Sequence, residues 1–214
     1  LLDLEAALST VLEFGYEEKD ILTTKNYCSV ILKHNNPCGA SISYSASQAF
    51  LNALECDSVS AFGGIVAFNS NIDSDTANNL KDIFLECVVA PSFDEEAFEI
   101  LKVKKNLRIL KLSKNILPNK RQTTTTKSIM GGLLVQDADN IEDTNESWVS
   151  VTKKNPNNQM NLDLNFAWKI CKHVKSNAIV IAKDQKTIGI GAGQMNRVGA
   201  AKIALTAAKE SCSE

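Results

Sequence analysis

The sequence lacks the features that mark secreted, membrane-spanning and cysteine-rich metal proteins. No apolar run is long enough to cross a bilayer, and the N-terminal residues lack the basic segment of a signal peptide. Six cysteines are scattered through 214 residues without a Cys-x-x-Cys pair. Such spacing argues against a disulfide framework or a zinc site, and it is typical of reduced thiols. We therefore expect a cytoplasmic protein with no metal site.

Excess charge is also missing. The chain has 23 basic and 25 acidic residues, a net charge of -2 and a pI near 5.8. This balance argues against nucleic-acid and anionic-membrane partners, although it leaves room for a local basic pocket. The chain begins with Leu inside an amphipathic pattern, and its last residues show no closing strand. We expect it to be a piece of a longer protein.

Apolar spacing predicts alternating helices and strands, and hence the α/β class. Helices are expected from the N-terminus to Gly15, over 45–56, from 73–75 onward, over 94–102, around 164–174 and from about 196. Strands are expected at 27–33, 65–68, 86–90, 107–112, 129–137 and on both sides of a turn at 184–186. Loops are expected at 34–44 and 57–64.

A polar stretch with four consecutive threonines, 113–128, divides the chain. Such composition is typical of a linker or a long surface connection. The elements before and after it follow a similar order, without a residue-level repeat. We predict a first subdomain over 1–115, a linker over 116–127 and a second, incomplete subdomain over 128–214.

The strongest local candidate is Lys33-His34, at the end of a buried strand. Histidine suits proton transfer near neutrality, and a lysine can stabilise a developing anion. Neighbouring residues of a strand face opposite ways, so the turn must begin here if both side chains are to reach one pocket. Pro37 and Gly39 make such a turn credible. A solvated strand end and an active-site loop both remain open.

Two glycine-rich segments are further candidates. Gly63 and Gly64 precede a strand, which permits either close approach to a ligand or a tight turn. Gly189, Gly191 and Gly193 alternate ahead of a helix that begins near Arg197, as in an anion site. Neither the dinucleotide fingerprint nor a Walker A loop fits.

The sequence around His34 and Cys38 does not fit the zinc deaminase pattern. That pattern needs His-x-Glu and Pro-Cys-x-x-Cys, whereas here His34 is followed by Asn-Asn and Cys38 by Gly-Ala-Ser. Hydrolytic deamination is therefore disfavoured. His173 lies in a helical stretch and is interpreted as a structural or surface residue.

Several blocks together resemble one family, the AICAR transformylase domain of the bifunctional AICAR transformylase/IMP cyclohydrolases. The blocks, in order, are KHNNPCGA, DSVSAFGGIVAFN, VVAPSFDEEA, GGLLVQD, VTKKNP and VKSNAIVIAKDQKTIGIGAGQMNRVGAAKIA. The resemblance implies two cytidine-deaminase-like subdomains in α/β/α layers, the second one incomplete. It also implies that the IMP cyclohydrolase domain is absent from this stretch.

The resemblance implies transfer of a formyl group from 10-formyltetrahydrofolate to the 5-amino group of AICAR, giving FAICAR in IMP biosynthesis. In that reaction His34 handles the amine proton, Lys33 supports negative charge and Asn177 orients the reacting groups. The substrate-binding positions would be Phe62, Gly63, Glu86, Gly191, Gly193 and Arg197.

The resemblance further implies a homodimer with active sites at its interface, AICAR and folate as partners, and a monovalent cation such as K⁺ near the segment before Asn177. Two other hypotheses remain: a deaminase-like hydrolase, and an inactive piece of the transformylase.

Overall fold

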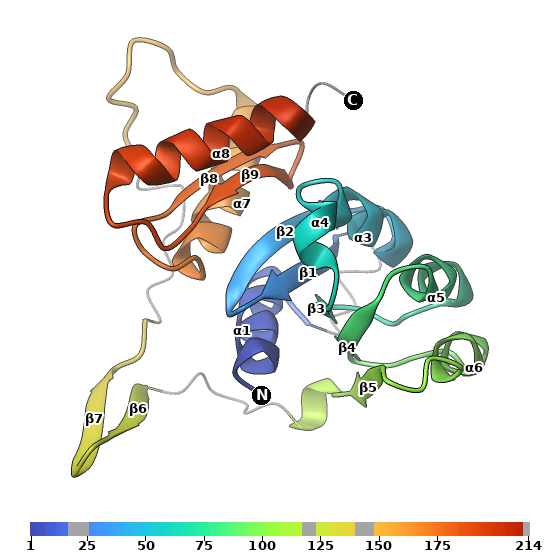
Figure 1. Ribbon diagram of the computed structural model, residues 1–214. Helices are drawn as coiled ribbons and strands as arrows, with labels where there is room; N and C mark the ends of the chain where they lie inside the picture. Colours follow the sequence, from blue (N-terminus) through green and yellow to red (C-terminus); the bar gives the residue numbers. More distant parts are fainter. Residues whose placement is uncertain (17–25, 117–122, 140–147, 212–214) are drawn as a thin grey trace.

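One mixed sheet organises the chain, with helices on both of its faces (Figure 1). The computed structural model describes residues 1–16, 26–116, 123–139 and 148–211. Seven strands follow the order β5-β4-β3-β1-β2-β9-β8. They are β1 Tyr27–Lys33, β2 Asn36–Ser43, β3 Gly64–Phe68, β4 Leu85–Ala90, β5 Arg108–Lys111, β8 Ile179–Lys183 and β9 Lys186–Gly191.

Strand directions change across the sheet. The strands β3, β4 and β5 run parallel, whereas β1, β2, β9 and β8 pair antiparallel. The β2–β9 contact joins elements far apart in sequence, since Ala40 N donates to Thr187 Oγ1 over 2.9 Å and Ile42 N to Gln185 O over 2.9 Å. The predicted α/β class is therefore confirmed.

The helices are α1 Leu2–Val11, α3 Ala46–Leu54, α4 Ser58–Ala61, α5 Ser74–Lys81, α6 Glu95–Lys102, α7 Asn158–Lys172 and α8 Arg197–Ser211, with 3-10 turns η1 Leu12–Phe14 and η2 Lys114–Ile116. One cluster of buried apolar residues lies on each face of the sheet. One joins α3, α5 and α6 to the sheet around Phe50 and Phe68, and the other joins α1 and α7 around Val11 and Phe166. Each such buried aromatic contributes about 2 kcal/mol of transfer free energy.

Helix starts follow the expected capping chemistry. Ser45 Oγ accepts from Gln48 N over 3.1 Å, and Asp73 Oδ1 accepts from Thr76 N over 2.8 Å. The helix expected around 164–174 begins earlier, at Asn158, because Asn157 Oδ1 accepts from Met160 N over 2.8 Å. The described helices include none that is long and apolar enough to span a membrane.

Two local predictions are wrong, and a third is right only in part. The expected loop at 34–44 contains β2, which pairs with β1 on one side and β9 on the other. The expected loop at 57–64 contains the short helix α4, capped by Asp57. The single strand expected at 129–137 is the second half of a hairpin, in which β6 Thr124–Ile129 pairs with β7 Gly132–Asp137.

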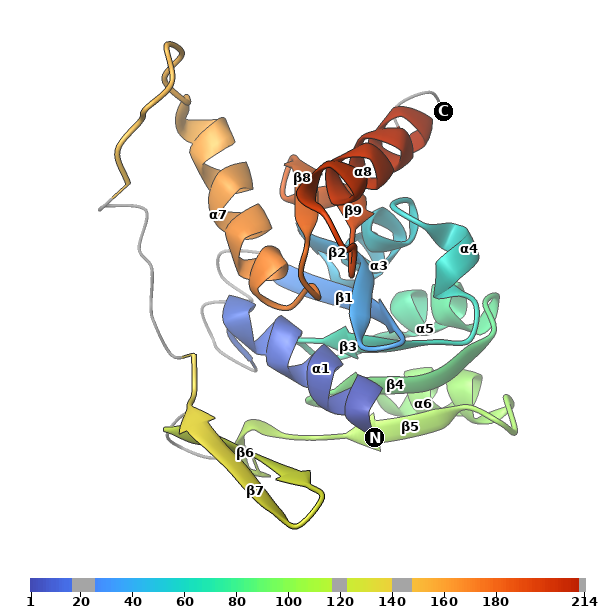
Figure 2. The ribbon, with the colours of Figure 1, turned by 60° about the vertical axis from the view of Figure 1, so that its left-hand side comes forward.

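The β6–β7 hairpin stands apart from the rest of the chain (Figures 1 and 2). All of its strand residues are exposed. It also overlaps the predicted linker, of which 117–122 lie outside the described residues. Strands from both sides of this linker share one sheet. The division into two subdomains stays a prediction.

Candidate active site

The turn between β1 and β2 presents the first candidate pair. His34 and Asn35 have φ angles of 52° and 60°, so both occupy the left-handed region. Two such residues form the tight hairpin turn that matches the twist of antiparallel strands, and Asn tolerates this backbone well. Lys33 is the last residue of β1 and pairs with Asn36. The turn therefore begins at His34, as expected if Lys33 and His34 are to reach one pocket.

The residues expected to make this turn do not make it. Pro37, Cys38 and Gly39 lie within β2. Pro37 pairs with Leu32 next to a shift of the strand register, where a strand tolerates a residue without an amide hydrogen. A Cβ at Gly39 would lie 1.9 Å from the carbonyl oxygen of Ala53, so this glycine admits α3 against the strand.

Lys33 reaches the loop that ends α4. Its half-buried side chain donates from Nζ to the carbonyl oxygen of Phe62 over 2.6 Å. Gly63 has a φ of 70°, and a Cβ there would lie 2.9 Å from the same Nζ. The Phe62 ring is 63% exposed and lies 5.0 Å from the ring of Phe84. Gly63 thus leaves room for the ammonium beside an accessible aromatic ring.

A cavity of about 250 Å³ opens beside this pair. It lies between the β1–β2 turn, α4 and the end of β9, and is lined by Lys33, His34, Asn36, Pro37, Cys38, Cys56, Asp57, Ser60, Ile190, Ala192 and Ala207. Burial raises the pKa of the Cys38 thiol to about 12 and that of Cys56 to about 11. Both thiols are therefore neutral walls near pH 7.

Asn177 lies on a segment that reaches the same turn. Its backbone N and its Nδ2 both donate to the carbonyl oxygen of Gln194, over 3.0 and 2.9 Å. Two residues earlier, Lys175 N donates to Asn36 Oδ1 over 2.9 Å. Since Asn36 directly follows the His34–Asn35 turn, this bond places the segment before Asn177 beside that turn. The catalytic roles of Lys33, His34 and Asn177 stay a prediction.

The glycine-rich segment has a mixed role. A Cβ at Gly191 would lie 2.0 Å from the carbonyl oxygen of Ala200, so this glycine lets α8 pack on β9. Gly193 is exposed with a φ of 63°, and Arg197 is exposed at the start of α8. The side chain of Asn196 accepts from Gly199 N over 2.7 Å and so caps that helix. Ligand binding by Gly191, Gly193 and Arg197 stays a prediction.

Glu86 lies outside the first cavity. It is exposed and lines a second hollow of about 430 Å³ together with Phe84, Lys105, Asn106, Leu107 and Arg108. The Phe84 ring also lies tilted against the ring of Phe62, whose carbonyl oxygen accepts from Lys33, so Phe84 connects the second hollow to the Lys33 contact. In the described part of the chain, His, Cys, Asp and Glu side chains form no group of three or more suited to a metal ion.

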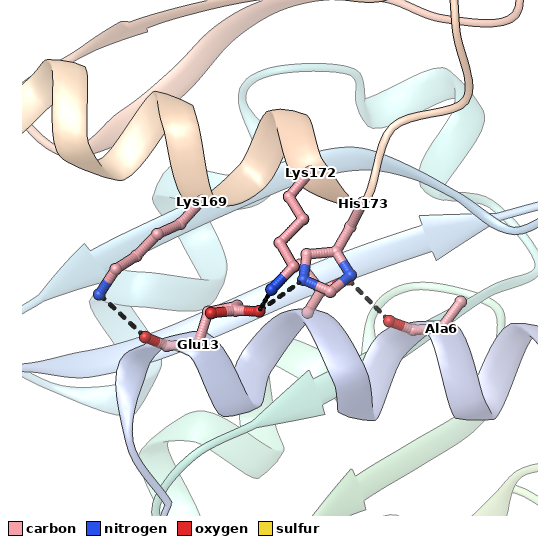
Figure 3. Close-up of polar contacts among 6 residues, drawn as sticks. Ala6, Glu13, Lys169, Lys172 and His173 are labelled. Atoms are coloured by element: carbon pink, nitrogen blue, oxygen red, sulfur yellow. Dashed lines mark hydrogen bonds and ion pairs between the residues drawn. The ribbon is translucent and has the colours of Figure 1, made fainter. Parts of the chain in front are cut away.

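Two carboxylates that no sequence motif predicted support the site region. Asp3 Oδ1 accepts from Asn35 N over 2.8 Å. Glu13 Oε1 accepts from Lys172 Nζ over 2.9 Å and lies 3.1 Å from His173 Nε2 (Figure 3). The interpretation of His173 as a structural residue fits this contact. Local spacing carries no signal for these pairs, because the partners of Glu13 lie about 160 residues away.

These features define an α/β protein with a candidate site for proton transfer at the end of a strand. A family model described as the AICARFT/IMPCHase bienzyme matches residues 1–207. The chain belongs to this family, so the resemblance drawn from its motifs is confirmed.

The relatives include bifunctional purine biosynthesis proteins PurH from Prochlorococcus marinus. The chain is 84% identical to that of strain MIT 9312 over 214 residues, which cover 100% of the chain and 41% of the relative. It is 52% identical to that of strain NATL1A over 210 residues, which cover 97% of the chain and 40% of the relative. The chain therefore spans about two fifths of the length of the curated relatives it matches.

Proposed function

We propose that this chain carries the formyl-transfer site of a longer purine-biosynthesis protein. A formyl group would pass from 10-formyltetrahydrofolate to the 5-amino group of AICAR, giving FAICAR on the way to IMP. Family membership and the names of the relatives support this proposal. The observation that carries it is the bond from Lys175 N to Asn36 Oδ1, which joins the Lys33-His34 turn to the segment of Asn177.

The chemistry of the reaction explains why Lys33, His34 and Asn177 would all be needed. The 5-amino group is a poor nucleophile, because the ring and carboxamide withdraw its lone pair. As its nitrogen attacks the formyl carbon, His34 takes the amine proton and Lys33 stabilises negative charge on the formyl oxygen. The bond from the formyl carbon to the folate nitrogen then breaks, and that nitrogen receives a proton. Asn177 orients the reacting groups through hydrogen bonds.

The remaining assignments belong to the same proposal. The exposed ring of Phe62 offers a stacking surface for the folate, next to Gly63. Glu86, Gly191, Gly193 and Arg197 would complete the AICAR and folate sites. The longer protein would be a cytoplasmic homodimer with K⁺ near Asn177, built from cytidine-deaminase-like subdomains over 1–115 and 128–214. The IMP cyclohydrolase activity would lie elsewhere in it.

The test is formyl transfer by the full-length protein. We expect His34→Ala and Lys33→Ala each to lower kcat at least about a hundredfold while the melting temperature stays near that of the wild type. Gln185→Ala, in a turn of the same geometry outside the site, is the matched control and should leave kcat unchanged. Near-normal turnover of either variant would remove that residue from the mechanism. Deamination without formyl transfer would favour the hydrolase instead.

A further inference from the structure

The N-terminal element Leu2–Phe14, formed by α1 and η1, contacts both segments of the candidate site. It lies along the α1/α7 face of the sheet (Figure 2), where Ala7 and Val11 are fully buried. This burial anchors the element to the core. Asp3 lies near the start of this element and Glu13 near its end. Each carboxylate binds a part of the chain outside the element.

Asp3 binds the turn that bears His34. Its Oδ1 accepts the backbone N–H of Asn35 over 2.8 Å, in the middle of the left-handed pair of the turn. Left-handed backbone is unfavourable for His34, although Asn35 tolerates it, so such a turn benefits from an external partner. The first end of the element therefore stabilises the conformation that presents His34.

Glu13 binds the end of α7, just before the segment of Asn177. Its Oε1 lies 2.9 Å from Lys172 Nζ and 3.1 Å from His173 Nε2, and its carbonyl oxygen accepts from Lys169 Nζ over 3.0 Å. Figure 3 shows the His173 ring between Glu13 and Ala6 of α1. The side chains of Glu13 and His173 are only 13% and 16% exposed. Such shielding makes the contact stronger than an ordinary surface pair.

The residues that directly follow the Glu13–His173 contact lead to the candidate site. After His173, Val174 N donates to Cys171 O over 3.1 Å and closes the helix. Lys175 then binds Asn36, and Asn177 binds Gln194. The position of Asn177 is thus set from one side by Gln194 and from the other by the anchor at Glu13.

We propose that Leu2–Phe14 is a positioning brace that sets the distance between the His34 turn and the Asn177 segment. This inference rests on the proposed formyl transfer. Asp3 and Glu13 act through other residues and are positioning residues. A displacement of reacting groups by about 1 Å can cost a hundredfold in rate, so a brace of this kind affects turnover more than binding.

The test compares variants of the full-length protein in formyl transfer. We expect Glu13→Ala to lower kcat about tenfold and Asp3→Ala about threefold, with KM changed less than about twofold. Asp3→Asn keeps the acceptor oxygen for Asn35 and should restore wild-type kcat. Glu5→Ala removes an exposed carboxylate from the same helix and is the matched control. If Glu13→Ala fails to fold, Glu13→Gln replaces it, with a smaller loss expected.

Hydrogen exchange gives a readout that does not depend on activity. Glu13→Ala should speed exchange in peptides covering 173–177 and 193–194, and Asp3→Ala in peptides covering 34–36, with the rest of the chain unchanged. Unchanged exchange there, or wild-type kcat in folded Glu13→Ala and Asp3→Ala, would overturn the brace. A wild-type protein without formyl transfer would overturn the proposed function alone, because the exchange result would still decide the brace.

Discussion

The β1–β2 and β8–β9 hairpins use the same device at different places. His34 and Asn35 have φ angles of 52° and 60°, and Asp184 and Gln185 have 53° and 54°. Each turn is also bound by a carboxylate from a helix on the same face of the sheet. Asp3 of α1 binds the first turn, and Asp163 of α7 binds the second. The β1–β2 turn lines the cavity of about 250 Å³. The β8–β9 turn precedes β9, whereas the cavity lies near the other end of that strand.

The comparison shows that a strained two-residue turn does not itself mark a functional site. Asp163 Oδ1 accepts from Gln185 N over 2.8 Å, and its Oδ2 accepts from Asp184 N over 3.1 Å. This second turn is bound even more completely than the first, yet it carries no candidate catalytic group. The position of the turn relative to other segments is what distinguishes them.

The largest effect should come from the glycines that seat a helix on each hairpin. A Cβ at Gly39 would lie 1.9 Å from Ala53 O, and a Cβ at Gly191 would lie 2.0 Å from Ala200 O. We expect Gly39→Ala and Gly191→Ala each to lower the unfolding free energy of the protein by about 3 kcal/mol, because a backbone atom cannot move aside without disturbing the helix. Chemical denaturation measures this. Gly132→Ala, with nothing within 4 Å of the new Cβ, is the control.

If Gly39→Ala were costly and Gly191→Ala harmless, the two hairpins would differ in rigidity. In that case α8 could shift on β9, and the close packing of the second hairpin would not be a requirement of the fold.

A smaller effect should follow from acid, because Glu13 links the supports of the two turns, α1–η1 and α7. Burial raises the pKa of Glu13, but hydrogen bonds from His173 and Lys172 and their charges outweigh burial and lower it from 4.5 to about 2. The stabilisation is therefore complete above pH 4.5 and is lost as pH falls towards 2. After allowance for solvent screening it amounts to about 1 to 2 kcal/mol.

Unfolding free energy measured from pH 5 to pH 2.5 would check this prediction. Glu13→Gln should flatten the fall by about that amount, whereas Glu5→Gln should leave the slope as it is. A wild-type slope in Glu13→Gln would contradict the lowered pKa.

The smallest effect concerns the support of the second turn. Asp163→Ala removes two acceptors from the β8–β9 turn and should lower stability by about 1 kcal/mol, without a change in kcat. Thermal unfolding and the formyl-transfer assay measure the two quantities. A loss of kcat equal to that of Asp3→Ala would contradict this difference between the two turns, since it would show that the second turn also positions the site.

Much of the fold could be predicted from local pattern. The strand at 27–33 and the helices that begin near residues 45 and 73 were predicted correctly, because strand burial and helix starts depend on neighbouring residues. Strand β2 was missed because Asn-Asn-Pro-Cys-Gly has the composition of a turn, and its partner β9 lies about 145 residues away. Pairing with β1 and β9 outweighed local propensity there.

The candidate site likewise contains residues that could be predicted from the sequence and others that could not. Lys33, His34 and Asn177 could be singled out, because their residue types suit proton transfer and their motifs match a family. The alternating glycines were interpreted as anion-binding amides, yet a Cβ at Gly189 or Gly191 would meet the backbone of α8. A glycine required for packing and one required for ligand approach look alike in sequence.

The α/β class, the starts of most helices and the residues with suitable chemistry follow from the sequence alone, since each depends on side-chain type and short-range spacing. The tertiary structure was needed to show that Asn36 joins the His34 turn to the Asn177 segment. It was also needed to show that Asp3 of α1 binds this turn and Glu13 of η1 binds the end of α7. These contacts connect residues between about 30 and 160 positions apart. Such contacts form only when the sheet brings distant segments together, and no local pattern encodes them.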